Sequence, residues 1–241
     1  MNPKHAIILA AGKGTRFSES TGSEVPKPLY PINGLPLIEH SIRNLLSLGV
    51  EQIHIGCGFH KQAFAYLETD YEAVRLSYNP YYEFRSSLYT LEMFKEEISE
   101  ATWVLEGDLL YEMKALECLV EQFETESLIL CTPPLEIDDN VYYRATQGRL
   151  LELSKTLPTH LAEGVMTGIW ILEAGLLGHF SSYCSLQPEA YTRDYEVMLA
   201  EFSRDQLPIY VYHSQGIAWC EIDHDEHLSY ALEYVLPKLS Y

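Results

Sequence analysis

Three basic side chains near the start of the chain have the types and spacing that a polyphosphate site requires. Lys13 and Arg16 flank Gly14 directly after the apolar run 5–10, and Lys27 follows between two prolines. Glycine lets backbone N–H groups approach an anion closely, while lysine and arginine add charge-assisted hydrogen-bond donors. We therefore expect this segment to bind the phosphates of a nucleoside triphosphate.

Two common phosphate-binding loops do not fit this spacing. A Walker loop requires a glycine five residues before its Gly-Lys pair and Ser or Thr after the lysine, but this chain has Ile7 and Gly14 at those positions. A dinucleotide-binding loop requires Gly or Ala three residues after Gly14, where this chain has the bulky Phe17. Neither an ordinary kinase loop nor a nicotinamide site is favoured.

Lys27 has a restricted backbone because it lies between Pro26 and Pro28. Its ammonium can therefore be held in one place with less conformational loss than that of a lysine on a free loop, which suits catalysis by a preorganised charge. The alternative for this tripeptide is an exposed turn without a functional role.

Two aspartates follow predicted strands. Asp108 comes after the strand predicted over 102–105, and Asp223 comes after 216–222 and before a predicted helix. Ligands of open α/β sheets bind where strands end, so both carboxylates are candidates for a ligand site. The structural alternatives are a turn for Asp108 and a helix N-cap for Asp223. With phosphate oxygens and water, the two carboxylates would suit Mg²⁺.

A transition-metal site is a separate alternative near the end of the chain. His213, His224 and His227 lie near Asp223 and Asp225 in the sequence, and imidazole with carboxylate can bind such ions. Histidines at the start of an exposed helix are more often solvated surface residues, and that interpretation is favoured here.

The order of Leu9-Ala10-Ala11-Gly12-Lys13-Gly14-Thr15-Arg16 and Pro26-Lys27-Pro28-Leu29 resembles the nucleotidyltransferases that couple a nucleoside triphosphate to a phosphorylated metabolite. Four later segments are similar to the branch that contains CTP:phosphocholine and 2-aminoethylphosphonate cytidylyltransferases: Gly58-Phe59, Asn79-Pro80-Tyr81-Tyr82, Ser87-Leu88-Tyr89-Thr90-Leu91 and Cys220-Glu221-Ile222-Asp223. The resemblance implies transfer of CMP from CTP to a small phosphorylated alcohol or phosphonate, with Mg²⁺ as cofactor and release of pyrophosphate.

The resemblance also implies roles for individual residues. The catalytic residues would be Lys27, Asp108 and Asp223, of which the two aspartates would bind the metal. The nucleotide would be bound by Leu9, Ala11, Gly12, Lys13, Gly14, Arg16, Asn79 and Ser87. The acceptor would be bound by Arg85, Gly168, Tyr195 and Glu196.

The acceptor is the less specific part of this prediction. Relatives often carry asparagines just before the Ser-Leu step, whereas this chain has Arg85, Ser86 and Ser87. Arg85 could bind the acceptor's phosphate or be an ordinary surface arginine. Two rival functions also stay open: a sugar-1-phosphate nucleotidyltransferase, and a nucleotide-sensing protein without turnover.

Composition limits the partners and the location that we expect. The 241 residues carry a formal net charge of −19, which argues against nucleic acid or an anionic membrane as a partner. The five cysteines are scattered without a close pair, as expected for reduced thiols in a cytoplasmic protein. The expected partners are CTP and a small phosphorylated acceptor, and a homodimer stays open.

The alternation of elements predicts an α/β fold with a mostly parallel, Rossmann-like sheet and helices on both faces. The predicted strands are 5–10, 52–57, 74–78, 102–105, 127–131, 141–145, 150–154 and 166–172. The predicted helices are 36–48, 61–68, 88–97, 113–124, 194–203 and 225–238. We expect one domain over 1–241, with a nucleotide-binding half over about 1–131 and a smaller, mixed acceptor-binding half with a C-terminal helix over about 132–241.

Overall fold

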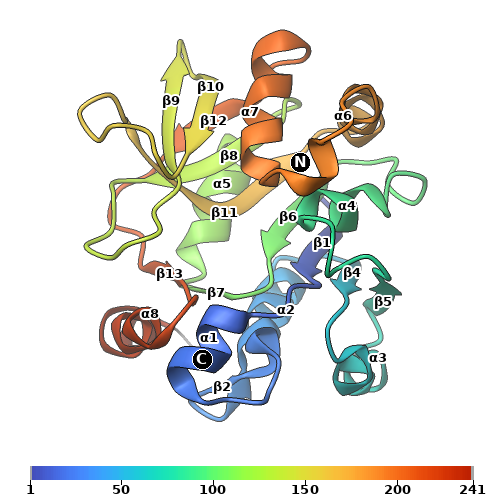
Figure 1. Cartoon of the computed structure of the whole chain (residues 1–241), viewed down its shortest axis with the longest axis vertical. Helices are drawn as coiled ribbons and strands as arrows, with labels where there is room; N and C mark the ends of the chain where they lie inside the picture. The colour runs from blue at the N-terminus through green and yellow to red at the C-terminus, as the bar shows by residue number, and fades with distance from the viewer. Residues whose placement is uncertain (1, 240–241) are drawn as a thin grey trace.

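The computed structural model describes residues 2–239, which form a nine-stranded mixed sheet with helices on both faces (Figure 1). The strands lie in the order β5 (Val74–Tyr78), β4 (Gln52–Cys57), β1 (His5–Ala10), β6 (Thr102–Glu106), β11 (Gly164–Leu172), β8 (Leu128–Thr132), β12 (Tyr210–His213), β10 (Arg149–Ser154) and β9 (Tyr142–Thr146). The α/β class expected from the sequence is confirmed.

The strands β5, β4, β1 and β6 are parallel, so their carboxyl ends lie at one edge of the sheet. In the second half of the chain, β12 is parallel to β8, but β11 runs antiparallel to both β6 and β8. The turn between β9 and β10 has positive φ at Gln147 and at Gly148. Two-residue turns with this backbone match the twist of the flanking strands and therefore join antiparallel strands directly. The expected parallel pairing therefore describes the first half, and antiparallel pairing dominates the second.

The helices are α1 (Thr15–Thr21), α2 (Leu37–Ser47), α3 (Tyr66–Asp70), α4 (Ser87–Glu92), α5 (Lys114–Gln122), α6 (Leu176–Ser185), α7 (Tyr195–Asp205) and α8 (Asp225–Tyr230). The bounds of α2, α5 and α7 agree closely with the prediction. The helix predicted over 88–97 ends at Glu92, and the one predicted over 61–68 divides into a short 3-10 turn and α3. The one predicted over 225–238 is α8 followed by a π-helical and a 3-10 turn.

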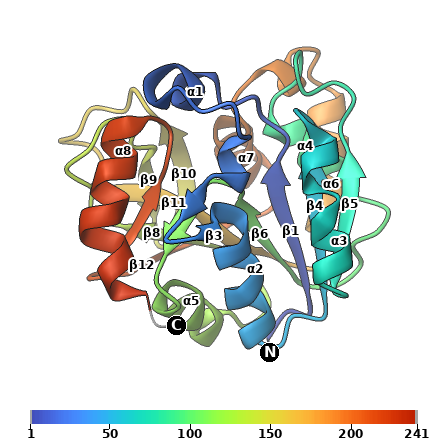
Figure 2. The same cartoon turned by 90° about the horizontal axis from the view of Figure 1, so that it is seen from below.

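Alternate residues of the central strand β1 face two different hydrophobic cores. Ile8 packs in the core that α2 and α5 cover, whereas Ile7 packs in the core that α4, α6 and α7 cover. Figure 2 shows α2 and α5 in front of the strands and α4 and α6 beside β4 and β5. Both faces of β1 are thus buried, which fixes the position of the loop that follows it.

A small sheet of β7 (Leu109–Tyr111) and β13 (Trp219–Glu221) brings the last part of the chain to the end of β6. The backbone N–H of Ile222 donates to the carbonyl oxygen of Asp108 at 3.0 Å. Asp108 and Asp223 are therefore neighbours in space although 114 positions separate them in the sequence. Another short pair, β2 (Pro31–Ile32) and β3 (Leu35–Pro36), precedes α2.

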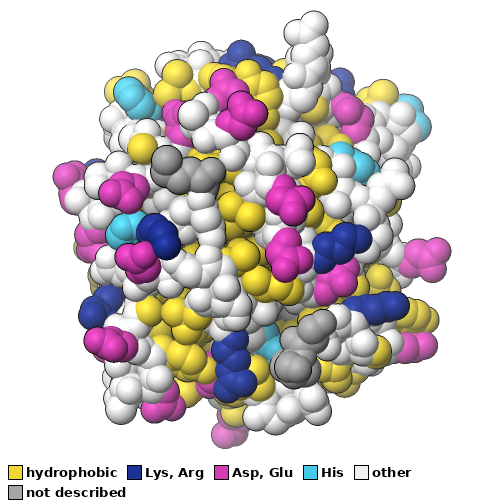
Figure 3. Space-filling view, turned by 180° about the vertical axis from the view of Figure 1, so that it is seen from behind, with side chains coloured by type: hydrophobic (Ala, Val, Ile, Leu, Met, Phe, Trp, Pro, Cys, Tyr) yellow, Lys and Arg dark blue, Asp and Glu magenta, His cyan; other side chains and the backbone are white. Residues whose placement is uncertain are grey.

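The surface agrees with the acidic composition. On the face shown in Figure 3, Lys and Arg side chains lie apart from one another among Asp and Glu side chains. Within residues 2–239, no helix is long and apolar enough to cross a membrane.

Candidate functional site

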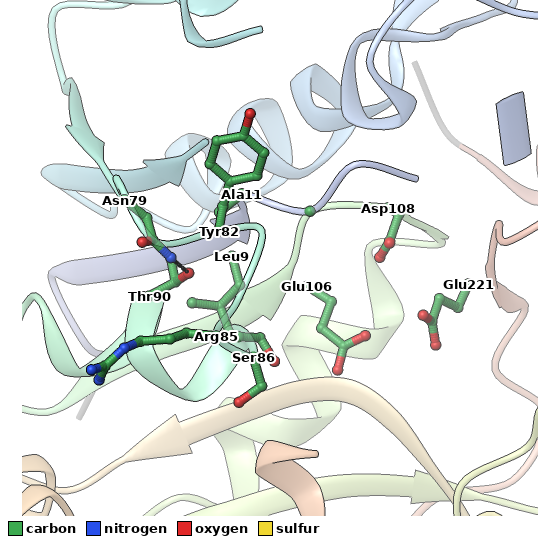
Figure 4. Close-up of a pocket in the computed structure, with 12 residues that line it drawn as sticks. Leu9, Ala11, Asn79, Tyr82, Arg85, Ser86, Thr90, Glu106, Asp108 and Glu221 are labelled. Carbon is green, nitrogen blue, oxygen red and sulfur yellow. Dashed lines mark hydrogen bonds between the residues drawn. The ribbon is translucent and has the colours of Figure 1, made fainter. Parts of the chain in front are cut away.

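A cavity of about 210 Å³ lies at the edge where the parallel strands end (Figure 4). It is lined by Leu9, Ala11, Gly12, Asn79, Tyr82, Arg85, Ser86, Ser87, Thr90, Glu106, Asp108 and Glu221. In Figure 4, Asn79 and Thr90 lie on one side of the cavity and the carboxylates of Glu106, Asp108 and Glu221 on the other. Apart from Arg85, the residues on the first side are uncharged, so the cavity joins an uncharged region to an acidic one.

The uncharged side contains most of the residues expected to bind the nucleotide. Leu9, Ala11, Gly12, Asn79 and Ser87 all line it. Asn79 is fully buried, and its side-chain amide donates to the hydroxyl of Thr90 at 2.9 Å. Because its side-chain oxygen Oδ1 accepts a hydrogen bond from the backbone N–H of Tyr81 at 2.8 Å, Asn79 also fixes the loop that follows β5.

A close approach between two loops narrows this side of the cavity. A Cβ atom on Gly58 would lie 2.5 Å from the carbonyl oxygen of Ala11 and 2.7 Å from the side chain of Tyr82. No side chain fits in that space, so glycine is required there. Gly58 thus lets the loops after β1 and β5 approach each other.

Two of the expected phosphate-binding cations form ion pairs at the rim. Lys13 is half-exposed and lies 2.7 Å from Glu83 in the loop after β5. Arg16, in α1, pairs with Asp139 and lies 2.9 Å from a carboxylate oxygen of Asp223. Gly14, between these cations, has a left-handed backbone with φ of 61° and precedes α1.

Lys27 is the buried cation of the site, and it lies between the two aspartates singled out in the sequence. Its ammonium is 2.6 Å from an oxygen of Asp108 and 2.7 Å from an oxygen of Asp223. Burial by itself would lower the pKa of Lys27, but the charges of Asp108 and Asp223 raise it above its usual value. Burial would likewise raise the pKa of Asp223, whereas Lys27 and Arg16 hold that pKa below its usual range.

Two glutamates that the sequence analysis did not select complete the acidic side. Oxygen atoms of Glu106, Asp108 and Glu221 lie within 4.8 Å of one another. Burial, together with the charges of Glu196 and Asp108, raises the pKa of Glu106 to about 8. Burial and the charges of Glu106 and Asp108 raise the pKa of Glu221 well above its usual value.

The donor set fits a hard divalent cation. The second oxygen of Asp108, Oδ1, is buried and has no hydrogen-bond partner among residues 2–239. An unpartnered buried carboxylate oxygen beside further carboxylates is typical of an oxygen-ligand metal site. The sequence does contain a pattern that could have indicated the two glutamates. Glu106 lies two residues before Asp108, and Glu221 lies two residues before Asp223.

Of the residues expected to bind the acceptor, Gly168, Tyr195 and Glu196 gather around this acidic cluster. The hydroxyl of Tyr195 donates to Glu106 at 2.6 Å. A Cβ atom on Gly168 would lie 3.0 Å from the carboxyl carbon of Glu106. Burial is the main cause that raises the pKa of Glu196 to about 7. Gly168 and Tyr195 thus surround Glu106, and their contact with an acceptor stays a prediction.

Arg85 has a different environment from the other three. Its guanidinium lies against three aromatic rings, 5.3 Å from the ring centre of Tyr81, 4.8 Å from that of Tyr89 and 5.1 Å from that of Tyr191. Figure 4 shows the side chain directed away from the carboxylates. Its role in binding the acceptor's phosphate stays a prediction.

The histidines near the end of the chain separate into two places. His213 accepts or donates a hydrogen bond with the hydroxyl of Tyr143 at 2.9 Å. His224 and His227 instead share one oxygen of Asp138, at 2.9 Å and 2.7 Å. Of the three histidines considered from the sequence, the fold therefore brings His224 and His227 together, beside Asp138, and places His213 elsewhere.

Comparison with known proteins gives one family. The model of the family described as MobA-like NTP transferase domain matches residues 6–161, which is more than half of the chain. Among solved structures, the inositol-1-phosphate CTP transferase from T. maritima superposes with a TM-score of 0.82 over 95% of this chain and 94% of that chain. Its sequence identity is 18%, so this likeness concerns the fold.

Curated relatives match a smaller part of the chain at higher identity. The 2-aminoethylphosphonate cytidylyltransferase of Lancefieldella rimae is 39% identical over 107 residues, which cover 44% of this chain and 43% of the relative. The choline-phosphate cytidylyltransferase of Streptococcus pneumoniae is 41% identical over 103 residues, which cover 43% of this chain and 44% of the relative. The matched segments thus span less than half the length of these two relatives.

Proposed function

Because the chain belongs to the family of MobA-like NTP transferase domains, we propose that it transfers CMP from CTP to a small phosphorylated alcohol or phosphonate and releases pyrophosphate. The names of the matched relatives support CTP as donor and phosphocholine or 2-aminoethylphosphonate as acceptor. Membership of this family favours turnover over the nucleotide-sensing alternative.

The observation that carries this proposal is the position of Lys27 between Asp108 and Asp223, where the parallel strands end. A buried ammonium beside a nucleotide cavity is a fixed positive charge in a place from which water is largely excluded. Lys27 would stabilise the charge that develops on the α-phosphate. Lys13 and Arg16 at the rim would bind the β- and γ-phosphates.

We propose that Asp108 and Asp223 hold Mg²⁺, with Glu106 and Glu221 close enough to adjust its surroundings. The ion, when bound, would neutralise phosphate charge during the transfer. Lys27 and Arg16 contact the two carboxylate oxygens of Asp223, so these two cations would have to give up part of their contact with Asp223 when the ion and the phosphates are bound.

The acceptor requires no general base from the protein. A phosphate monoester has a second pKa near 6 and is ionised at neutral pH, so its oxygen can attack the α-phosphorus directly. The task of the protein is then to position the two substrates and to stabilise charge. Glu196 in its charged form would attract the positively charged group of such an acceptor, and Glu106, to which Tyr195 donates and whose pKa is about 8, would add to this attraction as it loses its proton.

We also propose the division of labour expected from the sequence, with the nucleotide on residues up to about 131 and the acceptor on the remainder. The cavity is consistent with it, because its uncharged lining comes from β1 and the loop that follows it, from the loop between β5 and α4, and from α4 itself.

The test is the release of pyrophosphate in the presence of Mg²⁺, with each of CTP, UTP, GTP, ATP and dTTP. Each nucleotide is paired with phosphocholine, phosphoethanolamine, 2-aminoethylphosphonate and several sugar 1-phosphates. Turnover restricted to CTP with amine-bearing acceptors would support the proposal. Turnover only with sugar 1-phosphates would favour the rival transferase, and no turnover with any pair would contradict both.

A matched pair of variants connects the result with the site. Asp108→Asn should abolish turnover, because it removes a carboxylate that pairs with Lys27. Asp205→Asn should leave turnover unchanged, because Asp205 pairs with Arg204 on the surface.

A further inference from the structure

Asp223 is held at three of its atoms by side chains from other segments. Its two carboxylate oxygens accept hydrogen bonds from Lys27 at 2.7 Å and from Arg16 at 2.9 Å. Its backbone N–H donates to Nδ1 of His227 at 3.3 Å. The side chain of His227 is buried, with 2% of the residue exposed.

The bond to the backbone of Asp223 determines which ring nitrogen of His227 carries the proton. An N–H donor faces Nδ1, so Nδ1 must offer its lone pair, and the proton of the neutral ring is on Nε2. Nε2 lies 2.7 Å from an oxygen of Asp138, to which it donates. A hydrogen-bonded chain thus runs from Asp138 through His227 to the backbone of Asp223.

Asp138, the residue at which these hydrogen bonds begin, is itself held in place. Asp138 lies in the loop between β8 and β9, which is closed by the side chain of Asn140 through bonds to the backbone of Leu135 and Ile137. Its neighbour Asp139 pairs with Arg16. The same loop therefore reaches Asp223 twice, through His227 to its backbone and through Arg16 to its carboxylate.

We propose that His227 is a positioning residue for Asp223, with Asp138 as its anchor. The inference rests on the proposed function, in which Asp223 binds a divalent cation. Arg16 and Lys27 would turn toward the phosphates of a bound nucleotide, so their bonds to Asp223 would weaken. The hydrogen bond that the backbone N–H of Asp223 donates to His227 does not compete with the nucleotide and would keep Asp223 in place.

Mutation of a residue that hydrogen-bonds to a metal ligand, without touching the metal, commonly lowers the affinity for the metal by about 10- to 100-fold. Variants of His227 can separate its two bonds. His227→Asn keeps an acceptor at the position of Nδ1, whereas His227→Gln keeps a donor that reaches toward Asp138 but loses the acceptor. His224→Gln is the matched control, because His224 also bonds to Asp138 but has no bond to Asp223 among those that the structure records.

The quantity to measure is the Mn²⁺ concentration that half-saturates the protein–CTP complex in the absence of an acceptor. Water-proton relaxation reports the bound Mn²⁺, and a titration of CTP without protein provides the baseline. We expect His227→Gln to raise this concentration by about tenfold. His227→Asn should recover most of the loss, and His224→Gln should stay within twofold of the wild type. The melting temperature of each variant shows whether it is folded.

Asp138→Asn provides a second test that leaves the buried ring in place. It replaces a charge-assisted bond by a neutral one and should raise the half-saturating concentration by a few fold. Wild-type affinity in His227→Gln and Asp138→Asn, or equal losses in His224→Gln and His227→Gln, would overturn the inference. A wild-type protein that holds no Mn²⁺ with CTP would instead overturn the proposed metal site and this inference together.

Discussion

The ammonium of Lys27 lies 2.6 Å from a carboxylate oxygen of Asp108, and both side chains are largely buried. The two residues come from distant parts of the chain, and the fold places them at the end of β6. A buried charge that lost its partner would be costly, so each of the two side chains stabilises the charged form of the other. Asp223 gives the same ammonium a second partner.

Removing this cation should slow the reaction much more than it weakens binding of CTP. We expect Lys27→Met to lower kcat by about 100- to 1000-fold, the usual loss when a preorganised donor is removed. Steady-state kinetics with CTP and the acceptor that turns over will measure it. Lys4→Met is the control, because Lys4 pairs with Glu51 on the surface and should not affect kcat. A loss confined to KM would contradict a role in the transition state.

The pair of Lys13 and Glu83 should compete with the nucleotide. Both side chains are half-exposed, and the hydrogen bond to Glu83 is the main cause that raises the pKa of Lys13. Exposed pairs contribute little and are screened by salt, so Glu83→Gln should tighten binding of CTP by only a few fold, at low salt. Isothermal titration at two salt concentrations will measure this. Weaker binding in the variant would mean that Glu83 itself contributes to the nucleotide site, and Glu51→Gln is the matched control.

The strands at the centre of the fold could be predicted from the sequence because burial on both sides gives continuous apolar runs. The buried strands over 5–10 and 52–57 have the bounds that we expected, and so does the edge strand over 74–78. In contrast, β7, β12 and β13 have three or four residues each, and a run that short has no measurable period. Their extended conformation is stabilised by pairing with strands from elsewhere in the chain.

The candidate site shows the same limit. The resemblance selected Lys27, Asp108 and Asp223, and the fold brings their side chains together. Glu106 and Glu221 were missed because a glutamate within a strand gives no local signal of burial. Only the repeated Glu-x-Asp spacing at two strand ends could have indicated them. The roles of all five residues in catalysis remain predictions until the variants are measured.

The state of Glu196 should give acceptor binding a pH dependence. The pKa of Glu196 is raised to about 7, chiefly by burial, so the side chain becomes charged as the pH rises through neutrality. The quaternary ammonium group of phosphocholine is positively charged at every pH, so the KM for phosphocholine should fall as the pH rises from about 6 to about 8. Glu196→Gln should remove this part of the dependence and leave the parts that come from the acceptor's own phosphate and from Glu106, whose pKa is about 8. An identical profile in the variant would contradict a contact between Glu196 and the amine.

Gly168 should be required for the position of Glu106 as well as for the backbone. Its φ of 76° is unfavourable for other residues, and a Cβ atom would lie 3.0 Å from the carboxyl carbon of Glu106. Gly216 has a similar φ of 72°, but nothing lies within 4 Å of its Cβ position. The backbone cost of either Gly→Ala change is therefore similar, about 1–2 kcal/mol of unfolding free energy.

The difference between the two variants isolates the contact with Glu106. Urea unfolding should show Gly168→Ala to be less stable than Gly216→Ala, because Glu106 must move and its bond from Tyr195 must lengthen. The KM for an amine-bearing acceptor should rise in Gly168→Ala and stay unchanged in Gly216→Ala. Equal stabilities with an unchanged KM would show that Glu106 adapts to the added atom, and that the space left by Gly168 does not determine how the acceptor is bound.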